Sequence, residues 1–205
     1  MVSFNRIKSV VAVAIFTLVA IPMGLAAQEE PEYVEMTLGN PDAKVIVTEY
    51  ASFTCPHCGT FHQNVFGRLK SEYIDTGKIL FRLREIYFDR YGLWAGIVAR
   101  CGGESKYFGI VDLLFDKQDS WSRQNSPAQV AARLRGIGLA AGLTDTQLDA
   151  CLTDQANAEM LFAAYQEFAD DDGITSTPTF IINGKLHSNM PYEDFAELLD
   201  NELSE

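Results

Sequence analysis

Two short apolar runs rich in β-branched residues dominate the chain after its N-terminal region. The runs KVIVTEYA at 44–51 and ILFRLREI at 79–86 predict buried strands. The segment between them, 56–73, predicts a helix with Pro56 in its first turn, a position that proline favours. Strand, helix and strand in this order predict a βαβ unit with parallel strands and a right-handed crossover.

The pattern changes to helices in the middle of the chain. Predicted helices cover 93–101, 107–115, 127–137, 146–151 and 156–168. Breaks between them are predicted at 102–103, at 118–125 and at 142, where glycine or polar residues gather.

Strand character returns at 179–182, and the following Asn183-Gly184 is a strong hairpin signal that pairs this strand with 185–188. Pro191 then opens a last helix that runs to Leu203. The complete order is βαβ, a block of helices, and ββα, which predicts the α/β class. We interpret it as a thioredoxin fold in one domain, 44–90 and 170–205, with an inserted helical domain at 91–169.

The N-terminal region has a different composition from the rest. Residues 1–27 contain two basic residues, a long apolar run and a small-residue end, which predict a secretory signal peptide cleaved after Ala26 or Ala27. A membrane anchor is the alternative. Residues 28–43 are polar and acidic and predict a short lead-in with a turn. A cleaved signal peptide predicts a protein outside the cytoplasm, most simply in a bacterial periplasm.

The charge balance of the chain disfavours polyanionic partners. The chain carries 16 basic and 28 acidic residues, a net charge of −12, and loss of 1–27 removes Arg6 and Lys8 but no acidic residue. Nucleic acid and anionic lipid are therefore poor partners.

The most informative motif is Cys55-Pro56-His57-Cys58, between the first strand and its helix. Unpaired N–H groups and the helix dipole at a helix N-terminus favour a thiolate, so Cys55 is predicted to be the attacking sulfur. Cys58, one turn further along, is predicted to resolve the mixed disulfide. The motif therefore predicts a redox-active disulfide.

Structural disulfides and metal sites are the alternatives for a CxxC pair. A four-cysteine zinc site is weakly supported because the other cysteines, Cys101 and Cys151, are remote. Covalent haem needs a histidine after the second cysteine, where this chain has Gly59. His62 lies four residues beyond Cys58 and leaves open a metal-binding module that uses both thiols, but a packed or surface helix residue is the main expectation. We expect no cofactor.

These motifs resemble the DsbA family of periplasmic thiol-disulfide oxidoreductases. The resemblance is carried by Cys55-Pro56-His57-Cys58, the preceding Glu49-Tyr50-Ala51-Ser52-Phe53, the helical block, and Thr177-Pro178-Thr179-Phe180 before the hairpin. It covers most of the chain after the signal peptide, and it implies the thioredoxin fold and thiol-disulfide exchange. The Cys-Pro-His-Cys motif is fairly specific for this family, whereas the Thr-Pro-Thr-Phe segment is shared by many thioredoxin relatives.

Four further residues receive roles in this interpretation. His57 would stabilise the Cys55 thiolate, unless it only faces solvent. The resemblance implies a cis Pro178 against the cysteines, with the Thr177 backbone offered to an extended peptide; an ordinary trans turn is the alternative. Glu49 would be buried beneath the dithiol, where burial favours its protonated form and lets it exchange a proton with Cys58, unless it reaches solvent.

Cys101 and Cys151 form the remaining cysteine pair. In an oxidising compartment we expect a structural disulfide that contributes on the order of 4 kcal/mol. A second redox pair is the alternative.

The sequence therefore predicts a monomeric periplasmic dithiol oxidase acting on reduced or unfolded exported proteins. The resemblance implies that a membrane DsbB-like protein reoxidises it. An isomerase or reductase has the same motifs, and a metal-binding chaperone is a more distant alternative. Phe53, Tyr87 and Phe88 are candidates for a client groove, although core packing is the expected use of most of them.

Overall fold

A five-stranded mixed sheet forms the centre of the computed structural model, which describes residues 31–205. The strands are β1 (Met36–Gly39), β2 (Val45–Ala51), β3 (Ile79–Glu85), β4 (Thr179–Ile182) and β5 (Lys185–Ser188), in the spatial order β1-β3-β2-β4-β5. β2 and β3 are parallel, and the other neighbouring pairs are antiparallel. The predicted signal peptide, 1–27, lies outside the described residues.

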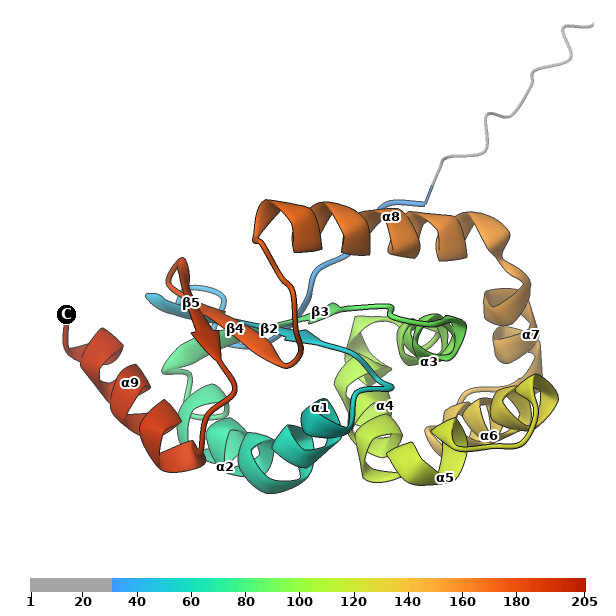
Figure 1. The fold of residues 1–205 in the computed structure, drawn as a ribbon, viewed down its shortest axis with the longest axis horizontal. Coiled ribbons are helices and arrows are strands. Elements are labelled where there is room, and N and C mark those ends of the chain that lie inside the picture. Colours follow the sequence, from blue (N-terminus) through green and yellow to red (C-terminus); the bar gives the residue numbers. More distant parts are fainter. Residues whose placement is uncertain (1–30) are drawn as a thin grey trace, which may run out of the picture.

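Helices cover the sheet and continue beyond it (Figure 1). They are α1 (Pro56–Phe61), α2 (Gly67–Leu69), α3 (Arg90–Arg100), α4 (Glu104–Asp116), α5 (Gln118–Ser122), α6 (Pro127–Ala140), α7 (Asp145–Thr153), α8 (Gln155–Asp171) and α9 (Tyr192–Ser204). Wider π-helical turns at His62–Phe66 and Lys70–Ile74 continue α1 and α2, so helical structure runs from residue 56 to 74. Among the described residues, no helix has the length and apolarity that crossing a membrane requires.

The sheet is the middle of three layers. Figure 1 shows α1, α2 and α9 on one side of the sheet and α8 on the other. On the first side Phe61 of α1 packs on Phe180 of β4, with ring centroids 4.8 Å apart, and Phe180 packs on Phe195 of α9 at 5.0 Å. On the second side the Tyr50 hydroxyl donates a hydrogen bond to Asp172 at the end of α8. Successive residues of β2 thus serve opposite layers, and Glu49 faces the layer that contains the CxxC helix.

The predicted α/β class and thioredoxin fold with inserted helices are confirmed. The βαβ unit has the predicted parallel strands, and the hairpin turns at Asn183 and Gly184, which both have positive φ (46° and 81°). Such a two-residue turn matches the twist of its strands. Figure 1 shows α3 to α7 as a group beside the sheet; the division into domains at 90/91 and 169/170 remains a prediction.

Two elements differ from the prediction. The lead-in at 28–43 contains strand β1, which pairs with β3 along four residues, and the predicted break at 118–125 contains helix α5. Both elements are too short to show a hydrophobic period of their own. Long-range contacts stabilise them instead, such as those of the fully buried Trp121, whose indole N–H donates to the carbonyl oxygen of Leu114 at 2.8 Å.

Candidate active site

The CxxC motif begins the helix that follows β2. Cys55 is the N-cap residue, with extended backbone (φ −81°, ψ 119°), and Pro56 occupies the first helical position. The Cys55 backbone N–H donates to the Ser52 carbonyl oxygen at 3.1 Å, which closes the turn between strand and helix. Both thiols are free; Cys55 is half-buried and Cys58 is fully buried. Only the first cysteine is therefore open to a substrate.

The two cysteines have opposite acid–base properties. Hydrogen bonding from the Cys58 thiol is the largest factor that lowers the pKa of Cys55, from 9.0 to about 5. The Thr177 side chain and the backbone N–H groups of Cys58 and His57 lower it further, whereas burial opposes them. Burial raises the pKa of Cys58 far above its ordinary value, helped by its hydrogen bond to Cys55 and by the charge of Glu49. At neutral pH the reduced site is a Cys55 thiolate beside a Cys58 thiol.

A loop from the other end of the chain contacts the exposed sulfur. The Thr177–Pro178 peptide bond is cis, and Cys55 Sγ lies 3.4 Å from the Thr177 carbonyl oxygen, to which the thiol form of Cys55 donates. The two residues are separated by 122 positions in sequence. The fold therefore brings the Cys-Pro-His-Cys motif and the Thr-Pro-Thr-Phe segment together at the sulfur of Cys55.

Glu49 lies beneath the dithiol in the buried layer. Its carboxylate is fully buried, and its Oε2 is 3.0 Å from Nε2 of His62. His62 is itself buried and stacks on Phe115, with ring centroids 4.0 Å apart. Glu49 thus sits in apolar surroundings with a histidine partner, a pairing that the sequence interpretation did not identify. In the sequence, the spacing between Cys58 and His62 indicated only that the two residues lie on the same helix.

His57 occupies the exposed first turn of α1. Its backbone N–H contributes to the low pKa of Cys55. Within residues 31–205 its imidazole forms no hydrogen bond or ion pair. The predicted role of the ring remains a prediction.

Gln118 is a site residue that the sequence analysis missed. Its buried amide donates to the carbonyl oxygens of Phe53, at 2.8 Å, and of Cys55, at 2.9 Å. Gly59 allows this close approach, since a Cβ there would lie 2.6 Å from Gln118 Oε1. Helix α5 therefore holds the active-site loop from the inserted helices. No local sequence signal marks Gln118, which falls in a predicted break.

A family model described as thioredoxin matches residues 32–201 of this chain. The chain belongs to the thioredoxin family. The crystal structure of α-DsbA1 from Wolbachia pipientis superposes with a TM-score of 0.78 at 28% identity and covers 85% of this chain and 93% of that one. Together with the Cys55-Pro56-His57-Cys58 motif and the cis Pro178 of this chain, these matches make the protein a DsbA-like member of the thioredoxin superfamily.

Two other relatives are informative. "Putative protein-disulfide oxidoreductase" of Rickettsia bellii is 35% identical over 172 residues, which cover 83% of this chain and 65% of that protein. The chain thus spans slightly less than two thirds of that relative. A structure named protein-disulfide isomerase, from Novosphingobium aromaticivorans, is 26% identical with a TM-score of 0.72, and covers 83% of this chain and 98% of that one.

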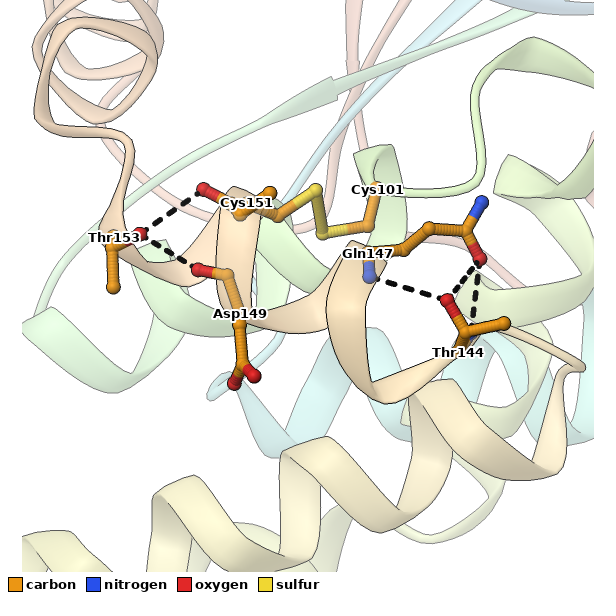
Figure 2. The surroundings of a disulfide bond; sticks show 7 residues. Cys101, Thr144, Gln147, Asp149, Cys151 and Thr153 are labelled. Carbon is orange, nitrogen blue, oxygen red and sulfur yellow. Dashed lines mark hydrogen bonds between the residues drawn. A yellow bond between two sulfur atoms is a disulfide. The ribbon is translucent and has the colours of Figure 1, made fainter.

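The other two cysteines of this DsbA-like chain are bonded to each other. Figure 2 shows the disulfide between Cys101, at the C-terminus of α3, and Cys151, in α7. Helix α7 begins with a capping box, in which the Thr144 hydroxyl accepts from the Gln147 backbone N–H and the Gln147 side chain accepts from Thr144. The disulfide ties α7 to α3 within the helical group, and the capping box fixes the N-terminus of α7.

The described residues offer little to a metal ion. Across 31–205, no three His, Cys, Asp or Glu side chains are grouped in a way that would bind one. His62, the proposed ligand of the metal-binding alternative, instead contacts Glu49.

Proposed function

We propose that this DsbA-like protein is a thiol-disulfide oxidoreductase that acts as a dithiol oxidase. One observation carries the proposal: the protein lowers the pKa of Cys55 to about 5 and keeps Cys58 protonated. A stabilised thiolate favours the reduced form of the pair, so the disulfide is a strong oxidant. It also makes Cys55 a good leaving group, so a bound client departs with its new disulfide.

The reaction transfers two electrons from a client dithiol to the protein. A client thiolate attacks Cys55 Sγ, the Cys55–Cys58 bond breaks, and Cys58 leaves as a thiolate that takes up a proton. The second client thiolate then attacks the client sulfur of the mixed disulfide, and Cys55 leaves as a thiolate. The client is oxidised to a disulfide, and the protein is reduced to a dithiol. On regeneration, Cys58 is the resolving thiol.

Client binding is supported by the surface next to the cis-proline loop. A cavity of about 160 Å³ adjoins the loop and is lined by Phe88, Tyr165, Ile174 and Ser176, among others. Phe88 is 57% exposed, whereas the other two aromatic candidates, Phe53 and Tyr87, are buried in the core. An extended peptide could pair with the Thr177 backbone and place an apolar side chain on Phe88.

The cellular setting follows from the same chemistry. We propose that the clients are reduced or unfolded exported proteins in the periplasm, reached through the predicted signal peptide. A DsbB-like membrane protein would reoxidise the dithiol, and the protein would act as a monomer.

An isomerase or reductase is the second candidate, favoured by the name of the Novosphingobium neighbour. Equilibration of the Cys55–Cys58 couple with glutathione separates the two candidates. The oxidase predicts a strongly oxidising potential, nearer the value of about −120 mV known for DsbA than the −270 mV of thioredoxin. A potential near that of thioredoxin would contradict the oxidase and leave the reductase.

A further inference from the structure

The buried pair of Glu49 and His62 ends at a cavity that is separate from the client surface. This cavity, of about 310 Å³, is lined by His62 together with Lys70, Asp112, Phe115 and Asp116, among others. None of its lining residues belongs to the CxxC motif or to the cis-proline loop. It shares no lining residue with the cavity beside the cis-proline loop.

The inner sulfur and the Glu49–His62 pair are all buried. Cys58 and Glu49 are fully buried, and the charge of Glu49 raises the pKa of Cys58. Glu49 reaches the cavity only through His62, whose side chain is 3% exposed. Among the described residues, two buried atoms of the pair have no hydrogen-bond partner, namely Glu49 Oε1 and His62 Nδ1. These are the atoms left free at the two ends once Oε2 and Nε2 have paired.

We propose that His62 relays protons between Glu49 and the water of this cavity, so that Cys58 can gain and lose its proton without contact with bulk solvent. The proposal rests on the dithiol chemistry proposed above and assigns it a second residue. His62 acts through Glu49 and does not touch the reacting sulfurs.

The proton balance follows the opening and closing of the disulfide. When the disulfide opens, the Glu49 carboxylate takes the Nε2 proton of His62 and passes a proton on to the Cys58 thiolate, so that Glu49 is again a carboxylate. Nδ1 of His62 then accepts a proton from the cavity. When the disulfide re-forms, the proton of Cys58 returns along the same groups. Each full cycle thus restores the original tautomer of His62.

Charged groups on three elements face His62. Glu49 approaches from β2, Asp112 and Asp116 from α4, and Lys70 from the helical turn that follows α2. The ring thus lies among three carboxyl groups and one amino group.

The substitution His62→Gln tests the relay because glutamine can keep a hydrogen bond to Glu49 but cannot carry a proton between two ring nitrogens. The measurement is the single-turnover rate at which dithiothreitol reduces the oxidised protein. It is made between about pH 5 and 8 and corrected for the thiolate fraction of the reagent. Because losing a positioned acid or base costs roughly 10²–10⁴-fold, we expect His62→Gln to slow the rate by at least about tenfold and to change its pH profile. The matched control is His187→Gln, on β5, which should leave the rate and its pH profile unchanged.

Further variants separate a relay from a purely structural role. His62→Phe keeps a ring that can stack on Phe115 and should lose as much rate as His62→Gln. Full activity of His62→Gln beside a slow His62→Phe would show that only the hydrogen bond matters, and would overturn the relay. In a Glu49→Gln background, His62→Gln should cause no further loss; a full additional loss would also overturn it.

The solvent isotope effect on the rate of the wild-type protein tests the relay without any His62 variant, which matters if those variants do not fold. The corrected rate should be slower in D₂O than in H₂O, and this difference should disappear in Glu49→Gln; an equal solvent effect in both proteins would contradict the relay. Failure of the wild type to exchange with dithiothreitol or glutathione would overturn the proposed function itself. Normal exchange with an unaffected His62→Gln would overturn the relay alone.

Discussion

The sulfur of Cys55 lies 3.4 Å from the backbone carbonyl oxygen of Thr177, a residue 122 positions away in sequence. The side chain of Thr177 favours the Cys55 thiolate, so the same residue contacts the sulfur and adjusts its acidity. The cis-proline loop is therefore part of the redox centre as well as a surface for peptides.

Replacing Thr177 with valine keeps its shape but removes its hydroxyl. The pKa of Cys55 should rise, because the Thr177 side chain is one of the groups that lower it. Loss of about 1.4 kcal/mol of thiolate stabilisation raises the pKa by about one unit, so the thiolate fraction near pH 5 should fall roughly fivefold. Ultraviolet absorbance of the thiolate measures this fraction, and Thr179→Val, at the start of β4, is the control. An unchanged pKa of Cys55 in Thr177→Val would show that the hydroxyl does not stabilise the thiolate.

Replacing His57 with alanine removes an exposed imidazole but keeps the backbone N–H that acts on Cys55. If the ring charge stabilises the thiolate, the disulfide of His57→Ala should be harder to reduce, by roughly tenfold for each pKa unit lost. The equilibrium constant with glutathione measures how easily the disulfide is reduced, and His187→Ala is the control. An equilibrium equal to that of the wild type would assign the effect to the backbone alone.

Replacing Gln118 with alanine should loosen the active-site loop. The carbonyl oxygens of Phe53 and Cys55 would lose their donor, and a buried acceptor without a partner costs about 1–3 kcal/mol. Chemical denaturation should show a loss of this size. Gln124→Ala is the control, because the Gln124 amide donates to Ser120 instead. Equal stability of the two variants would contradict the anchoring role of Gln118.

The disulfide between Cys101 and Cys151 closes a loop with a sequence separation of 50 residues. Removing it by the double substitution Cys101→Ala and Cys151→Ala should lower the free energy of unfolding by about 4 kcal/mol. Dithiol exchange at Cys55 should persist, which distinguishes a structural bond from a second redox pair. Loss of exchange in a folded double variant would favour the second redox pair.

These residues show how far the sequence alone could lead. Cys55 and Cys58 were recognisable because strand, CxxC and helix are adjacent in the chain, and the parallel βαβ pair and the C-terminal hairpin followed from local patterns. Gln118 and the partnership of His62 with Glu49 were not recognisable, because each depends on an approach between elements that local spacing does not encode. Strand β1 was missed for the same reason, since its pairing with β3 stabilises it more than its own sequence does.

The central claim is that the fold holds Cys55 as a thiolate while Cys58 stays protonated. Titration of the reduced protein, followed by thiolate absorbance and by the pH dependence of alkylation at Cys55, tests it directly, with Cys55→Ser as the blank. We expect one sulfur that ionises with a pKa of about 5 and a second that stays protonated through neutral pH. Ionisation of Cys55 near its ordinary pKa of 9.0 would contradict it.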